Sequence, residues 1–210
     1  MPGSSNFQEL QQQVWKEIIR KGCSEASAAL EQMLGFPLKM TGVVAGTIPV
    51  AKITFLAGDP EKIVVGARLH FSGDIAGHMI LILWPESWDK CKKALMPMVG
   101  DKDLEASAFA ELANVTCSFF IMNLANITNL SINFTPPEVM EDMTATVLED
   151  TLIKFGEEAS ELLTIETTFS SPDVEIKGFL FFIPSQASIK TITQRFLEAA
   201  ANLDRNQTGG

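Results

Sequence analysis

The chain has 210 residues, of which 46% are hydrophobic and 20% are charged, and its net charge is -10 at pH 7. This composition supplies ample apolar material for a core and excludes a disordered chain. The negative charge repels phosphate backbones and anionic lipids, so neither a nucleic-acid nor a membrane partner is expected. The apolar runs are shorter than the roughly 20 residues of a spanning helix, and no signal-peptide pattern opens the chain. We therefore expect a cytoplasmic protein.

The expected elements follow one another in the same order in two halves of the chain. The first half reads as a long helix over about 7–34, a strand at FPLKM, two strands in HFSGDIAGHMILILWP and a helix at ESWDKCKKALM. The second half reads as a long helix, a strand at NLSINF, two strands in TFSSPDVEIKGFLFFIP and a helix at QASIKTITQRFLEAA. Matched positions lie about 94 to 98 residues apart, which indicates an internal repeat.

This repeat predicts one α+β domain over residues 1–210, made of two repeats at about 7–98 and 101–200. Two halves related by a pseudo-twofold axis would join their strands into one mostly antiparallel sheet with the long helices packed on it. The segment 136–159 shows a helical period, whereas the matching segment 47–65 fits either a strand pair or a short helix. Residues 203–210 are expected to form a frayed tail.

The second long helix carries both an apolar and a polar stripe. At 100° per residue, the apolar stripe predicted to face the core consists of Ala108, Leu112, Val115, Phe119 and Met122. The polar stripe consists of Ser107, Glu111, Asn114 and Ser118. Side chains three residues apart project side by side, about 5 to 6 Å between their Cβ atoms, so one external group can meet both Glu111 and Asn114. By itself, such a stripe is also typical of an ordinary solvated helix face.

A longer spacing makes the polar stripe more informative. Ser107, Glu111, Asn114 and Pro137 follow the pattern S/D-x3-E-x2-N-x22-P, which resembles the signature of the CheC/CheX/FliY-type chemotaxis phosphatases. The repeat and the segments ELANVTCSFFIMNLANI and SEASAALEQMLGFPLKM are also similar to that family, over nearly the whole chain. The resemblance implies a duplicated CheC-like domain with its motif on the long helix.

The resemblance also implies a reaction, the hydrolysis of the aspartyl phosphate on a CheY-type response regulator. Asn114 would orient the attacking water, and Glu111 would contact the active-site lysine of the regulator. Ser107 and Pro137 would support them. Positioning and charge stabilisation suffice for this chemistry, so no covalent nucleophile is needed. The Mg²⁺ would belong to the acidic pocket of the regulator, so this chain is expected to bind no metal or cofactor.

The first half departs from the pattern, because Gln13, Glu17, Arg20 and Val43 stand at the equivalent positions. A guanidinium has donors but no acceptor, so Arg20 cannot orient a water as a carboxamide oxygen can. We therefore predict a single active site, on the second long helix. We interpret residues 7–34 as a packing helix, and an exposed Glu17–Arg20 pair of little consequence is the alternative.

Histidines and cysteines offer no rival site in the sequence. His70 and His78 share metal-ligand spacing with no Cys, Asp or Glu cluster, so we interpret them as satisfied or surface residues. Cys23, Cys91 and Cys117 are odd in number and lack CxxC spacing, which favours buried thiols over disulfides or zinc.

Charge and the sheet edges leave alternatives open. The first 100 residues carry a net charge of +1 and the remainder -11, which indicates a solvated acidic face on 138–161 or steering toward a basic partner. The rival to the phosphatase is a non-catalytic module that docks a regulator, a CheD-type deamidase or a second copy of itself. Open sheet edges would allow a homodimer. A flagellar switch component is less favoured, because no switch domain follows the second repeat.

Overall fold

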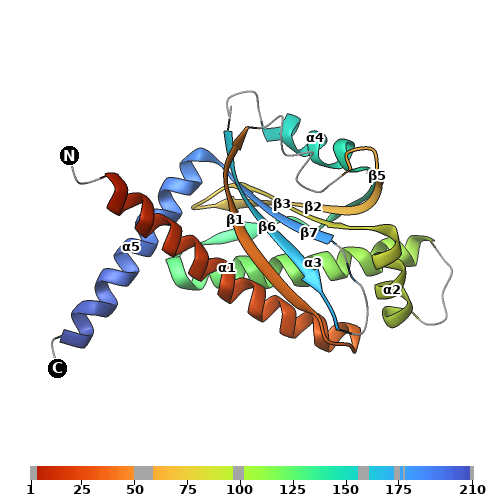
Figure 1. Cartoon of the computed structure of the whole chain (residues 1–210), viewed down its shortest axis with the longest axis horizontal. Helices are drawn as coiled ribbons and strands as arrows, with labels where there is room; N and C mark the ends of the chain where they lie inside the picture. The colour runs from red at the N-terminus through yellow and green to blue at the C-terminus, as the bar shows by residue number, and fades with distance from the viewer. Residues whose placement is uncertain are drawn as a thin grey trace.

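The structure, a computed structural model, describes residues 4–49, 59–96, 102–155, 161–172, 176 and 178–208. Two long helices, α1 (Ser4–Leu34) and α3 (Lys102–Thr128), cover one face of a central sheet, and α4 (Thr144–Phe155) covers the other (Figure 1). The larger part of the core lies between the sheet and the two long helices, and a smaller apolar cluster lies under α4.

The sheet has seven strands among the described residues, and every strand pair in it is antiparallel. The strands are β1 (Lys39–Pro49), β2 (Ile63–Gly73), β3 (Gly77–Leu83), β4 (Ile132–Phe134), β5 (Glu138–Met143), β6 (Glu161–Ser170) and β7 (Gly178–Pro184). Their order is β1-β6-β7-β3-β2-β4, and β5 also pairs with β2. The predicted α+β fold with a mostly antiparallel sheet is therefore confirmed.

The strand order is symmetric about the central pair of strands, β7 and β3. β3 of the first half lies beside β7 of the second, and β2 and β6 flank them in the same way. Leu81 and Leu180 are direct partners across this central pair, and each stands four residues before a proline, Pro85 or Pro184. A duplication about a pseudo-twofold axis would produce this arrangement, and we propose the two repeats on that ground.

The buried face of α3 differs from the predicted one. Its buried residues are Phe109, Leu112, Ala113, Thr116, Cys117, Phe120, Ile121, Asn123, Leu124 and Thr128. Of the predicted stripe only Leu112 is fully buried, and Met122 is 53% exposed. The helix is apolar nearly all round, so its own period did not specify which side faces the core. The close contact with α1 specifies the buried side, because a Cβ on Gly22 would lie only 2.8 Å from the Phe120 ring.

One further expectation was wrong at the level of secondary structure. The segment after Pro137 begins with β5, and α4 starts only at Thr144, whose amide donates to the Lys62 carbonyl at 2.8 Å. Pairing with β2 overrides the helical period there. α5 (Gln186–Thr208) continues through most of the segment 203–210, for which fraying stays a prediction. Residues 50–58 of the undecided first-half segment lie outside the described residues, and its flanks belong to β1 and β2.

The three cysteines are free and buried, as predicted. Burial raises the pKa of the Cys91 thiol, on α2 (Pro85–Leu95), to about 11 and also raises the pKa of Cys117. By length and composition α3 alone among the described helices is apolar enough to cross a membrane, but half of that stretch is buried inside the fold. Its apolar character is therefore the character of a core helix.

Candidate functional site

A pocket at the edge of the sheet brings the four motif residues together. The cavity has a volume of about 470 Å³, and its lining residues are Ser107, Ala110, Glu111, Asn114, Phe134, Thr135, Pro136 and Pro137. One wall is the outer face of α3, and the other is the segment that joins β4 to β5. Residues separated by 30 positions in the chain thus face one small space.

The α3 wall presents its polar groups in successive turns. Ser107 and Glu111 are exposed, and Asn114 is half-buried. The Ser107 hydroxyl donates to the Asp103 carbonyl at 2.9 Å, so it is engaged within its own helix and lies past the helix start. Within the described part of the chain, the side chains of Glu111 and Asn114 make no hydrogen bond or ion pair. A carboxylate and a carboxamide are therefore available side by side for an external partner.

The opposite wall is held by a reciprocal pair of hydrogen bonds to β2. The Thr135 amide donates to the His70 carbonyl at 2.9 Å, and the His70 amide donates to the Thr135 hydroxyl at 3.0 Å. β4 extends this attachment, because Phe134 pairs with Phe71. These bonds fix the two prolines that follow in front of Asn114.

The same wall is anchored at its other end by an ion pair. Arg68 on β2 donates to the carboxylate of Glu138, its direct cross-strand partner immediately after Pro137. The Arg68 side chain is only 6% exposed, so this pair lies partly out of water. Sequence reasoning missed both residues. The available signal was a lone arginine inside the apolar strand IVVGARLHF.

A second polar contact lies near the start of α3. On α2, the Lys92 Nζ atom lies 3.0 Å from Asp89 Oδ1 and 3.1 Å from Glu105 Oε2. The hydrogen bond with Asp89, followed by the one with Glu105, raises the pKa of the lysine. This contact ties α2 to the first turns of α3 and leaves Glu111 outside the network.

No three His, Cys, Asp or Glu side chains among the described residues gather in a way that could hold a metal ion. His70 and His78 are direct partners across β2 and β3, with ring centroids 5.0 Å apart. They lie with Arg68 and Glu138 in a separate cavity of about 350 Å³ behind Thr135 and Pro136. They therefore border the motif pocket without lining it.

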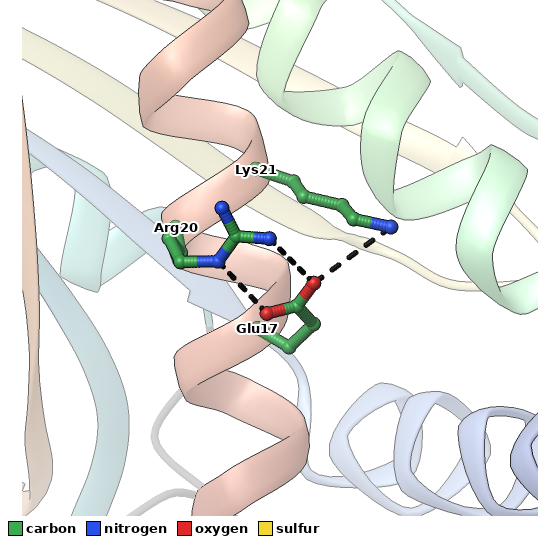
Figure 2. A network of polar contacts seen from close by, with 3 residues as sticks. All are labelled: Glu17, Arg20 and Lys21. Atoms are coloured by element: carbon green, nitrogen blue, oxygen red, sulfur yellow. Dashed lines mark hydrogen bonds and ion pairs between the residues drawn. The ribbon is translucent and has the colours of Figure 1, made fainter.

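The first-half positions hold a different constellation, shown in Figure 2. Arg20 donates two hydrogen bonds to the Glu17 carboxylate, from Nε to Oε2 at 2.9 Å and from Nη2 to Oε1 at 2.8 Å. Lys21 Nζ lies 3.7 Å from Glu17 Oε1. These contacts lower the pKa of Glu17 and raise the pKa of Arg20. The exposed Glu17–Arg20 pair of the alternative interpretation is therefore present. The first-half carboxylate is thus already occupied, whereas Glu111 is not.

Comparison with known proteins gives matches in sequence and in fold. A model of the CheC-like family matches residues 104–141, which include Ser107, Glu111, Asn114 and Pro137. The chain is 21% identical over 200 residues to the CheY-P phosphatase CheC of Bacillus subtilis (strain 168), a match that covers 90% of this chain and 94% of that protein.

Two solved structures extend the match to the fold. The crystal structure of Thermotoga maritima FliY has a TM-score of 0.72 at 15% identity, covering 90% of this chain and 96% of that one. CheX in a CheX-CheY-BeF3-Mg²⁺ complex from Borrelia burgdorferi has a TM-score of 0.54 at 17% identity, covering 80% of this chain and 98% of that one. Sequence and fold comparisons therefore agree on the family that the motif predicts.

Proposed function

We propose that this chain, a CheC-like protein of the CheC/CheX/FliY family, is a cytoplasmic phosphatase of a phosphorylated CheY-type response regulator. The observation that carries the proposal is the motif pocket, in which an unoccupied carboxylate and carboxamide face the Pro136-Pro137 wall. The B. subtilis relative is named a CheY-P phosphatase, which supports a chemotaxis phosphatase.

The proposed chemistry needs only positioning groups from this chain. The carboxamide oxygen of Asn114 accepts a hydrogen bond from water and aligns it with the aspartyl phosphate of the regulator, while the NH2 group holds a phosphate oxygen. Glu111 pairs with the cationic lysine of the regulator and fixes the docked helix. Mg²⁺ in the acidic pocket of the regulator neutralises phosphate charge, so hydrolysis proceeds without a covalent intermediate on this chain.

The surface around the pocket suits a protein substrate. Three large apolar side chains are exposed near the motif: Leu104 and Met122 on α3 at 50% and 53%, and Phe134 at 37%. On a helix of 3.6 residues per turn, Leu104, Glu111 and Met122 lie along one line, so the apolar groups flank the carboxylate. Exposed apolar residues around a polar centre are typical of a docking surface.

The rival proposal is a non-catalytic module that uses the same surface to dock a regulator, a CheD-type deamidase or a second copy of the chain. The carboxamide discriminates between the two proposals. A docking surface needs the apolar residues and Glu111, whereas water positioning also needs the acceptor oxygen of Asn114.

The decisive experiment follows the decay of a phosphorylated CheY-type regulator with Mg²⁺ in the presence of the wild-type chain, Asn114→Ala and Arg20→Ala. We expect faster decay with the wild type and Arg20→Ala, and a loss of about hundredfold in kcat with Asn114→Ala. Arg20→Ala is the matched control, because it changes the equivalent residue of the first half. If the wild-type chain binds the phosphorylated regulator but leaves its decay rate unchanged, the docking module is favoured.

A further inference from the structure

A second cavity, larger than the motif pocket, lies in the first half between α1 and the start of β1. Its volume is about 840 Å³. Its lining residues on α1 run from Lys16 to Glu31, a distance of about 22 Å at 1.5 Å per residue, so the cavity is an elongated groove. None of its lining residues belongs to the motif pocket.

The floor of the groove is apolar and belongs to the main core. The side chains of Ile19, Cys23, Leu38 and Met40 line it and are at most 4% exposed. The α1 wall beside them consists of small residues, Ser24, Ser27 and Ala28, which allow close approach of another chain. The floor side chains are therefore fixed by the core, and the exposed apolar surface of the groove comes from its walls, such as Ala28.

Two hydrogen-bonded contacts hold the groove in its open shape. The Ser27 hydroxyl accepts from the Met40 amide at 2.8 Å and lies 2.7 Å from the Cys23 carbonyl. The Glu31 carboxylate accepts from the Leu38 amide at 3.1 Å. These α1 side chains accept hydrogen bonds from the Leu38 and Met40 amides and so tie α1 to the start of β1. The groove therefore exists before anything binds.

The rim of the groove is cationic, in a chain whose net charge is -10. Lys16 and Arg20 stand on the α1 wall and Lys39 on the β1 wall, whereas Glu31 is the one carboxylate among the described residues that line the groove. Within the described part of the chain, Lys16 and Lys39 make no ion pair. Arg20 is held in place by Glu17 (Figure 2). Two exposed ammonium groups therefore remain available on opposite walls.

We propose that this groove binds an acidic amphipathic segment of a partner protein. Its length matches about four turns of helix or about seven extended residues, whereas a small molecule would fill only part of it. The apolar lining of the groove receives one face of the segment, and the carboxylates of the segment pair with Lys16 and Lys39. This interaction surface is independent of the proposed phosphatase activity.

The test uses two fluorescein-labelled helical peptides of about 15 residues, each with one Leu/Ala face and Glu residues at the N-terminal or the C-terminal end. Matched peptides carry Lys in place of Glu. Fluorescence anisotropy compares the wild-type chain with Lys16→Glu/Lys39→Glu and with Lys93→Glu/Lys190→Glu. The last variant changes the net charge equally at exposed lysines of α2 and α5, outside the groove.

We expect at least one Glu peptide to bind the wild-type chain and the control variant alike. Binding should weaken at least tenfold in Lys16→Glu/Lys39→Glu, and the Lys peptides should bind more weakly than the Glu peptides. Failure of both Glu peptides to bind, equal binding of Glu and Lys peptides, or equal losses in the two variants would overturn the proposal. A dimer of the chain that dissociates only in Lys16→Glu/Lys39→Glu would also overturn it, by identifying a second copy as the occupant. Phosphatase activity stays unchanged in every variant.

Discussion

Asn114 and Arg20 occupy equivalent places in the two halves, and their chemistry separates a proposed active position from an inactive one. The carboxamide of Asn114 makes no hydrogen bond within the described part of the chain, whereas the guanidinium of Arg20 is hydrogen-bonded to Glu17. An amide has both an acceptor and donors, and a guanidinium has donors only. This difference fits a proposed site in the second half alone, and Gln13 and Val43 of the first half also depart from the motif.

Glu111 is expected to act in docking rather than in the chemical step. Glu111→Gln retains the shape of the side chain but removes the charge that pairs with the regulator lysine. We expect KM for the phosphorylated regulator to rise about tenfold with little change in kcat. Steady-state kinetics at two salt concentrations measures this effect, and the difference between variant and wild type should shrink at high salt. A fall in kcat at unchanged KM would instead assign Glu111 to the chemical step.

The buried thiols lead to a second prediction at this scale. Burial raises the pKa of Cys91 to about 11, so this thiol is protonated and shielded at pH 8 in the folded chain. We expect all three cysteines to react with a thiol reagent such as DTNB only after unfolding in guanidinium chloride.

The sign of the pH effect follows from the same shift. Between about pH 9 and about pH 11 the unfolded chain releases the Cys91 proton while the folded chain keeps it. This contribution to the free energy of unfolding is therefore lost as pH rises through that window. In Cys91→Ala, the free energy of unfolding, measured with urea, should decline less steeply as pH rises through this window. Rapid labelling of the folded chain at pH 8 would contradict the buried placement.

Among the elements, the β4–β5 connection determines the shape of the motif pocket. Hydrogen bonds between Thr135 and His70 hold one end, and the Arg68–Glu138 ion pair holds the other. Pro136 and Pro137 lie between these anchors and complete the wall opposite Asn114. Proline restricts the backbone of this wall but has no amide to donate to the sheet, so the flanking residues Thr135 and Glu138 make the attachments.

Glu138→Ala tests the second anchor. Loss of the carboxylate removes the cross-strand ion partner of the buried Arg68, so we expect the free energy of unfolding to fall by about 1 to 3 kcal/mol. If the wall positions the docked regulator, phosphatase activity falls as well. Glu141→Ala is the control, because Glu141 is exposed on the same strand. Urea unfolding and regulator decay measure the two effects, and equal effects of both substitutions would argue against an anchor.

At the scale of the whole molecule, one sheet carries two long helices, α1 and α3, and the described residues form one motif pocket with available groups, on α3. The central pairing of Leu81 with Leu180 relates the halves, so a second site would have been expected on α1 by symmetry. α1 instead carries the Glu17–Arg20 pair and the cationic groove. In the proposed duplication, the two halves thus differ in surface chemistry.

This asymmetry predicts one regulator per chain. A CheY-type regulator activated with beryllofluoride should bind with a stoichiometry of one to one, measured by isothermal titration calorimetry. Met122→Asp should weaken this binding about tenfold or more, because it places a charge in the exposed apolar part of the proposed docking surface. Lys190→Glu on α5 should leave it unchanged. A stoichiometry of two regulators per chain would contradict a single site.

Local patterns in the sequence determined the order of most elements and the motif spacing, and they predict the repeat. Strand character at HFSGDIAGHMILILWP and helix character at ESWDKCKKALM depend on residues close together in the chain, and the structure has both elements there. The Glu111 and Asn114 pair is likewise a local feature, since three residues on a helix always lie side by side.

Only the tertiary structure decided which faces and segments meet. α3 is apolar on most sides, so its contacts with α1 and the sheet selected Phe109 and Phe120 for the core and left Met122 exposed. β5 became a strand because β2 offered it an edge, although its sequence has a helical period. The Arg68–Glu138 pair and the groove between α1 and β1 join residues far apart or on different elements. Such contacts depend on long-range packing, which no local period encodes.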